Sequence, residues 1–232
     1  MLSVTIMPDA EMKFAYIPPG SFSMGGTADE EKPIREVTLT KGFYMGIVPV
    51  TQAQWLWVMG NDSRPSHFTG DDRPVENVSW IDCQGFLAEL RKRIDKPVRL
   101  PTEAEWEYAC RAGSTTDYFN GNDEKALGCA GWYAGNSDKQ THPVAQKQPN
   151  RWGLYDTHGN VWEWCQNYGD AAYYKKGENK DPQGPQSGTT RVLRGGSWGN
   201  VPALCRAECR CDFVPAYRND SLGFRVCFAW TS

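Results

Sequence analysis

The alternation of hydrophobic and polar positions divides the chain into three parts of different character. Residues 13–49 alternate apolar and polar side chains between Gly and Pro breaks, a pattern typical of short antiparallel strands. Residues 51–113 show helical spacing, whereas residues 114–200 are rich in Gly, Asn and Asp and have no convincing periodic segment. A loop region of this length is unusual in a compact domain, so we expect a metal ion or aromatic packing to organise it.

Three helices are predicted from one start signal, a hydroxyl cap followed three residues later by a side chain that reaches back to the cap. The three signals are Thr51 with Gln54, Ser79 with Asp82, and Thr102 with Glu105. The second helix has the clearest apolar face, formed at helical spacing by Cys83, Phe86, Leu87, Leu90 and Ile94. The third is expected to end at Gly113, because Gly commonly follows helix C-termini.

Composition and charge narrow the class of protein. The 232 residues include 40% hydrophobic and 23% charged side chains, an ordinary globular balance, and the net charge of −3 does not favour binding to nucleic acid or anionic membranes. No apolar run approaches the roughly 20 residues of a membrane span. The N-terminus lacks the layout of a signal peptide. Because no repeat or linker is visible, we expect one domain over residues 1–232.

The eight cysteines do not indicate a zinc site. Their spacing contains no CxxC motif, and the histidines at 67, 142 and 158 lie far from them in sequence. Cys83 and Cys110 fall among apolar residues of predicted helices, where we expect them to be buried as small hydrophobic side chains. The sequence leaves the redox compartment open.

Seven motifs occur in a recognisable order: GSFSMGG, PVTQAQW, PVENVSW, RLPTEAEWEYACRAG, PNRWGLYDTHGNVWEW, RVLRGGSW and GFRV. Together they closely resemble the formylglycine-generating-enzyme-like, or sulfatase-modifying-factor, domain over nearly the whole chain. The resemblance implies an α+β variant of the C-type lectin fold with little regular secondary structure. The two glycines of RGGSW are expected to permit close approach of neighbouring backbone, followed by an aromatic anchor.

Calcium is the cofactor that the resemblance implies. Asp156 and Glu163 offer carboxylate oxygens, and the backbone carbonyls of Gly159 and Val161 are expected to complete the shell. In the alternative arrangement Asp156 caps a turn and Glu163 pairs with an arginine.

Formylglycine-generating enzymes hold copper with two cysteines in the segment after RGGS, and a two-thiolate site suits Cu(I). Here the first of those positions is Asn200 and the second is Cys205. Cys209 and Cys211 lie nearby but out of register with the motif. We therefore expect no catalytic residues and no copper. An oxidase of a protein cysteine, with an incomplete copper-binding pair, is the alternative function.

The C-terminal segment, residues 194–226, also resembles the variable region of proteins diversified by diversity-generating retroelements. A fixed frame is kept at Arg194–Trp198, Pro202, Cys205, Arg206, Arg210, Pro215, Arg218 and Gly223–Val226. The remaining slots, here named the variable positions, are predicted to bind the ligand: Gly199, Asn200, Val201, Ala203, Leu204, Cys209, Cys211, Asp212, Phe213, Val214, Tyr217, Asn219, Asp220 and Ser221.

The residue types at the variable positions agree with this interpretation. Adenine-directed diversification turns Asn codons into codons ending in C or T, which cannot encode Lys, Gln, Glu, Met or Trp, and none of the fourteen positions holds one of these. Small polar residues beside the aromatic Phe213 and Tyr217 are also typical of a binding surface. Frame arginines 206, 210 and 218 are expected to hydrogen-bond backbone carbonyls.

The resemblance thus implies a bacterial or phage-borne receptor displayed at a cell surface. Its expected partner is a protein or another macromolecule.

Overall fold

The computed structural model describes residues 2–7, 10–176 and 178–229. Its helices are α1 (Gln52–Met59), α2 (Trp80–Arg91), α3 (Glu103–Arg111), α4 (Glu124–Ala130) and α5 (Ala171–Lys176), with a short 3-10 helix, η1, at Pro202–Cys205. Its strands are β1 (Leu2–Met7), β2 (Ala10–Ile17), β3 (Gly20–Met24), β4 (Arg35–Leu39), β5 (Phe43–Gly46), β6 (Trp162–Tyr168), β7 (Arg191–Arg194), β8 (Arg210–Phe213), β9 (Leu222–Gly223) and β10 (Cys227–Ala229). This is the predicted α+β class with little regular structure.

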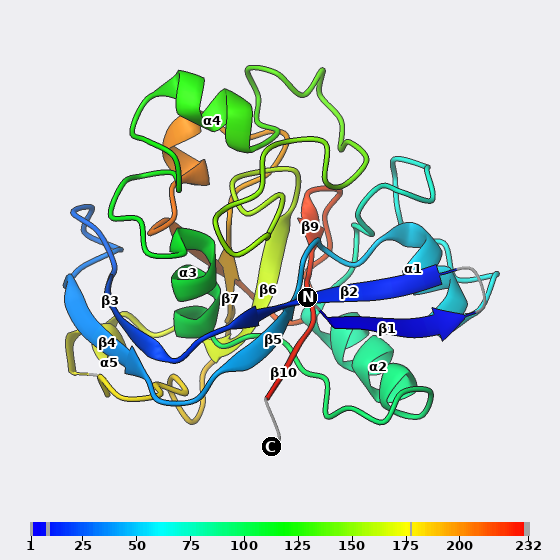
Figure 1. The fold of residues 1–232 in the computed structure, drawn as a ribbon, viewed down its shortest axis with the longest axis horizontal. Helices are drawn as coiled ribbons and strands as arrows, with labels where there is room; N and C mark the ends of the chain where they lie inside the picture. The colour runs from blue at the N-terminus through cyan, green and yellow to red at the C-terminus, as the bar shows by residue number, and fades with distance from the viewer. Residues whose placement is uncertain (1, 8–9, 177, 230–232) are drawn as a thin grey trace.

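Three sheets are formed by the described residues. One has the strand order β1-β2-β5-β10, a second pairs β3 with β4, and the third has the order β8-β7-β6-β9. In the third sheet β7 pairs antiparallel with both β6 and β8, whereas β9 runs parallel to β6. Strands from the C-terminal segment therefore form both edges of the third sheet, and Figure 1 shows β6 and β7 side by side, next to α3.

The predicted helices and strands of the first half are confirmed. Each of α1, α2 and α3 begins at a complete capping box on Thr51, Ser79 or Thr102. The end of α3 differs by one residue, because Ala112 itself adopts the left-handed conformation at the C-cap and Gly113 follows it. The strands between residues 10 and 46 pair antiparallel, as their alternation predicts.

Residues 114–200 contain more regular structure than the sequence predicts, namely α4, α5, β6 and β7. The prediction was wrong here because all four residues of β7 and most of β6 are buried, so neither strand alternates between apolar and polar residues. Side chains that bond the backbone help to organise the intervening loops. Asn150, for example, donates to the carbonyls of Ala109 and Cys110 and accepts from Leu154 N–H.

Two large clusters of apolar side chains form most of the core. One packs α2 against β6 and β9, and includes Cys83, Phe86 and Phe224. The other surrounds α3 and includes Cys110 and Trp106. Cys83 and Cys110 are both fully buried, which confirms their predicted role as small hydrophobic side chains. The shared strands β6 and β7 contribute to both clusters and thereby place the C-terminal segment against the core.

Candidate functional site

The variable positions lie mainly at the surface, as predicted. Thirteen of the fourteen are exposed or partly exposed. The exposed ones are Gly199, Val201, Ala203, Leu204, Asp212, Phe213, Val214 and Tyr217. The partly exposed ones are Asn200, Cys211, Asn219, Asp220 and Ser221. Cys209 is the exception, because it is buried and packs in the core beside α2, so it does not fit a role in contacting a ligand.

A groove of about 290 Å³ opens among these positions. Seven of the residues that line it are variable: Asn200, Leu204, Cys211, Phe213, Tyr217, Asn219 and Ser221. The other three are Trp162, Arg210 and Leu222, which belong to β6, β8 and β9. The sheet thus contributes residues outside the variable set to the groove. The sequence prediction missed Trp162 and Leu222 because only the pairing of β6 with β9 brings them together.

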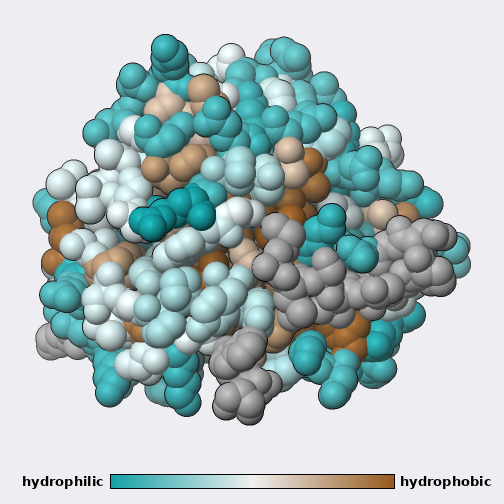
Figure 2. All heavy atoms as spheres, in the orientation of Figure 1, coloured by the Kyte–Doolittle hydropathy of each residue, from teal (hydrophilic) through white to brown (hydrophobic). Residues whose placement is uncertain are grey.

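Large hydrophobic side chains are concentrated around the groove. Of the eight exposed ones in the described part of the chain, five are at variable positions: Val201, Leu204, Phe213, Val214 and Tyr217. The rings of Phe213 and Tyr217 stack with centroids 4.4 Å apart. Exposed apolar side chains that gather in one place are typical of interaction sites. A single exposed apolar side chain is common and does not indicate such a site. On the face drawn in Figure 2, by contrast, hydrophobic residues occur in small separate groups among hydrophilic ones.

The frame glycines are placed where a side chain does not fit. Gly195 and Gly196 both have positive φ, and a Cβ on Gly196 would lie 2.6 Å from Cys205 Sγ and 2.8 Å from Leu204 O. The predicted close approach is confirmed, and it seats η1 on the turn after β7. Trp198 follows as the predicted anchor, donating from Nε1 to the carbonyl of Asp220 at 3.1 Å.

Backbone anchoring rests mainly on arginines other than the three predicted. Fully buried Arg194 donates to the carbonyls of Glu208 and Cys209, and fully buried Arg225 donates to those of Gly46 and Tyr155. The three arginines predicted for this role, Arg206, Arg210 and Arg218, mainly form ion pairs with Glu31 and Glu208, with Glu103, and with Asp82, respectively. Of these three, Arg206 also donates to the Ala203 carbonyl and Arg210 to the Glu30 carbonyl.

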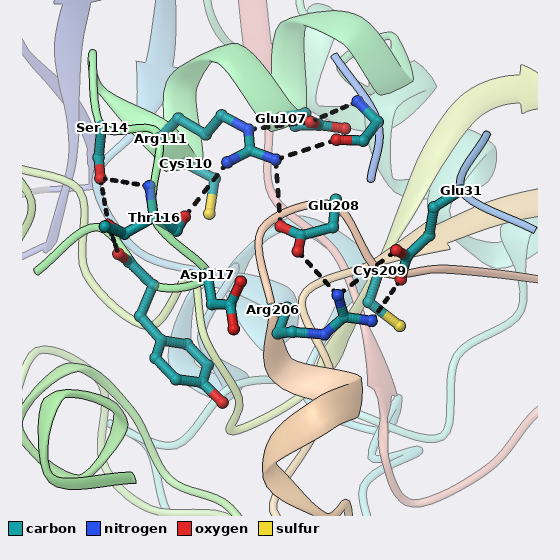
Figure 3. Close-up of polar contacts among 12 residues, drawn as sticks. Glu31, Glu107, Cys110, Arg111, Ser114, Thr116, Asp117, Arg206, Glu208 and Cys209 are labelled. Atoms are coloured by element: carbon teal, nitrogen blue, oxygen red, sulfur yellow. Dashed lines mark hydrogen bonds and ion pairs between the residues drawn. The ribbon is translucent and has the colours of Figure 1, made fainter. Parts of the chain in front are cut away.

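A network of charged side chains, most of them buried, joins α3 to residues 194–226, here named the variable segment. Arg111 bonds Glu107 on its own helix and Glu208 in the variable segment, and Arg206 bonds both Glu208 and Glu31 (Figure 3). The second carboxylate oxygen of Glu107 accepts from Arg194. These pairs keep the pKa of Glu107 below its usual value despite complete burial, which acts in the opposite direction. The variable segment is therefore held by side chains that lie outside its variable positions.

Three of the four predicted calcium ligands, Glu163, Asp156 and the Gly159 carbonyl, accept hydrogen bonds from groups of the chain itself. Both oxygens of Glu163 accept from Arg225 at 2.6 Å, and one also accepts from Trp106 Nε1. Asp156 accepts from Ala145 N–H and Asn160 Nδ2, and the Gly159 carbonyl accepts from Val161 N–H. A guanidinium in bidentate contact occupies the carboxylate that a cation would need. The pairing of Glu163 with an arginine is one half of the alternative considered from the sequence, whereas Asp156 bonds the N–H of Ala145, eleven residues away.

The positions of the copper pair are likewise occupied by groups with other contacts. Asn200 accepts a hydrogen bond from Ser197 Oγ, and burial raises the pKa of the Cys205 thiol to about 12. A buried dyad of Cys110 and His158 also lies nearby, with Sγ and Nε2 3.6 Å apart. Burial raises the pKa of Cys110 to about 12 and lowers that of His158 to about 4, so the dyad is uncharged at neutral pH. His158 instead joins Phe119 N–H to the Cys205 carbonyl.

Comparison with known proteins finds relatives of this chain both in sequence and in structure. The formylglycine-generating enzyme of Streptomyces coelicolor is 37% identical over 177 residues, covering 70% of this chain, and the chain spans only 52% of that enzyme's length. The structure of Treponema denticola variable protein 1 matches with a TM-score of 0.91 and 30% identity over 98% of both chains. PvdO from Pseudomonas aeruginosa matches with a TM-score of 0.87 and 26% identity, covering 99% of this chain and 98% of PvdO.

No helix among the described residues is long and apolar enough to cross a membrane. The model of the sulfatase-modifying factor enzyme 1-like domain matches residues 6–229. The chain therefore belongs to the family of sulfatase-modifying factor enzyme 1-like domains.

Proposed function

We propose that this protein binds a macromolecular ligand through the surface formed by its variable positions, and that a retroelement diversifies those positions. One observation carries the proposal: exposed hydrophobic side chains gather at variable positions around the groove, while most frame residues between them are partly or fully buried. Such a division lets the surface change while the fold is kept. The likeness to a variable protein over 98% of both chains supports it.

An oxidase acting on a protein cysteine is the second candidate, because a formylglycine-generating enzyme is among the relatives. The residues favour binding over this chemistry. Asn200 stands at one position of the thiolate pair, and the thiol at the other position is buried with its pKa raised to about 12. We also propose that the protein is displayed at a cell surface, on the basis of its resemblance to retroelement-diversified proteins.

The retroelement part of the proposal is tested on the encoding DNA. We expect a near-copy of the last hundred or so bases of the coding sequence, differing from it only at adenines, beside a reverse transcriptase gene. Differences spread over all four bases, or no second copy in the locus, would contradict diversification.

The binding part is tested with two displayed libraries of this chain, both selected on immobilised lysozyme. One carries codons ending in C or T at the thirteen variable positions other than Cys209. The control library carries the same codons at thirteen exposed or partly exposed positions of residues 120–148. We expect binders at least tenfold more often from the first library, because its positions surround a groove. Equal recovery from both would contradict the proposal.

A further inference from the structure

An exposed isoleucine outside the variable segment lies beside the variable surface. Ile81, in the first turn of α2, is 56% exposed although α2 otherwise turns its large apolar residues toward the core. Nothing in the packing of α2 requires an aliphatic side chain there. A large apolar group in water at a fixed position is therefore a candidate for contact with a partner.

Three contacts join the start of α2 to residues 214–219 of the variable segment. Ile81 N–H donates to the Pro215 carbonyl at 3.3 Å, and Asn77 N–H donates to the Asn219 carbonyl at 2.9 Å. Between them, Arg218 forms a bidentate ion pair with Asp82 at 2.7 and 2.8 Å. These contacts hold the start of α2 alongside the loop that carries Val214 and Tyr217, and so place Ile81 next to the variable positions.

The groove and the start of α2 carry little unbalanced charge, whereas two variable positions, Asp212 and Asp220, add carboxylates to the surrounding surface. Arg218 and Asp82 neutralise each other, and Arg210, the charged residue among those lining the groove, pairs with Glu103 at 2.8 Å. The polar groups in the groove are neutral, with the side chains of Asn200, Asn219 and Ser221 beside the phenol of Tyr217. The partner group that matches the groove is uncharged, because a charged group would lose its hydration there without gaining an opposite charge.

The aliphatic groups around the groove distinguish a protein partner from a glycan. Leu204, Val201, Val214 and Ile81 offer methyl groups, against which the hydroxyls of a sugar would be desolvated without hydrogen bonds. The groove of about 290 Å³ is also at the small end of ligand sites, a size that suits one large side chain. Interfaces between proteins commonly seat such an anchor in a pocket ringed by weaker contacts.

We propose that the partner is a protein that inserts an uncharged aromatic or large aliphatic side chain into the groove and packs apolar side chains against Ile81. The inference rests on the proposed function and adds a fixed contact, Ile81, to the variable ones. Every diversified form of this chain then keeps part of its contact surface unchanged.

The test uses a phage-displayed library of disulfide-closed peptides selected on the intact protein. Individual peptides are then measured against Ile81→Ser, Leu204→Ser and Ile34→Ser. Ile34 is the matched control, because it is also 56% exposed but lies in the loop between β3 and β4. We expect the selected peptides to share an uncharged aromatic or aliphatic residue. Ile81→Ser and Leu204→Ser should each weaken their binding at least tenfold, and Ile34→Ser less than twofold.

The outcomes separate this inference from the proposed function. Weakening by Leu204→Ser but not by Ile81→Ser would overturn the fixed contact and leave the variable surface as the binding site. Binding unaffected by both changes would overturn both proposals. Recovery of mainly charged peptides, or binding on a glycan array at the same surface without any peptide selected, would overturn the assignment to an apolar protein partner. Melting curves of the three variants confirm that each is folded.

Discussion

Two phenylalanines of the C-terminal segment, Phe213 and Phe224, lie in opposite environments. Phe224, a frame residue, is fully buried and contacts the rings of Trp55 and Phe86 edge-on. Phe213, a variable position, is 38% exposed and stacks on Tyr217 at the edge of the groove. Residue type alone does not distinguish them. The retroelement-like frame does, because it assigns one to the scaffold and the other to the surface.

This difference predicts unequal losses of stability. Phe224→Ala removes a buried ring and should lower the free energy of unfolding by about 3–5 kcal/mol. Phe213→Ala removes a surface ring and one stacking partner, and should cost about 1 kcal/mol or less. Urea denaturation of both variants measures the two values. Similar losses at the two sites would show that the division into frame and variable positions is mistaken.

His158 makes stability depend on pH. Burial lowers its pKa to about 4 from 6.5, so between these values the unfolded chain binds more protons than the folded one. The contribution of His158 to the free energy of unfolding is therefore complete above pH 6.5 and falls by at most about 1.4 kcal/mol per pH unit down to about pH 4. Glu76, whose pKa burial raises to about 7, acts in the opposite direction.

The measurement compares the free energy of unfolding of the wild-type chain and of His158→Gln by urea denaturation from pH 4 to pH 8. Subtracting the two values cancels the contributions of Glu76 and of the other titratable groups that both chains share. The stability advantage of the wild-type chain should shrink as the pH falls from 6.5 toward 4. An advantage that is the same at every pH would mean that His158 titrates normally in the folded protein.

Helix α3 forms three of the ion pairs that hold the variable segment, residues 194–226. Three of its four charged residues, Glu103, Glu107 and Arg111, pair with Arg210, Arg194 and Glu208. One helix therefore holds the segment at the end of β7, before β8 and at the start of β8. Because these charges are buried, removing one member leaves its partner without compensation.

Glu107→Gln should lower the free energy of unfolding by about 3–5 kcal/mol, because Arg194 and Arg111 then lose a buried counter-charge. Glu89→Gln is the control, since Glu89 pairs with Lys92 on the exposed side of α2 and should change stability by less than about 1 kcal/mol. Chemical denaturation provides both numbers. Equal effects would show that burial does not strengthen the α3 network.

The sequence predicted some elements better than others, because only some of them carry a signal in neighbouring residues. Helices α1, α2 and α3 carry their start signals within four residues, so the capping boxes identified them. Strands β6 and β7 are mostly buried and pair with each other, and β6 also pairs with β9 and β7 with β8. Their residues carry no alternation, and pairing partners far apart in sequence leave no local signal.

At the scale of the whole molecule, one fold carries both an enzyme and a variable protein among its relatives. The site residues therefore decide the function. The exposure of the variable positions was predictable, because the frame motif marks them one by one. The charge network was not, since Glu31, Glu107 and Arg206 meet only through the tertiary structure (Figure 3).

The whole chain should not oxidise a cysteine-containing peptide in the presence of Cu(I) and oxygen, because Asn200 cannot supply one of the two thiolates that hold copper. Thiol loss is followed with a thiol-reactive dye, and the S. coelicolor relative serves as the positive control. Copper-dependent turnover above that of free copper would restore the oxidase as the function.

The bonds from Arg194 to the carbonyls of Glu208 and Cys209 are made to the main chain, which is the same whatever residue is encoded there. A mutational process acting at position 209 therefore leaves this anchor in place. The Cys209 side chain, however, is buried, and bulky or charged replacements would not fit. Under the proposed diversification, a share of the new sequences should consequently fail to fold, so that folding selects among them before any ligand is met.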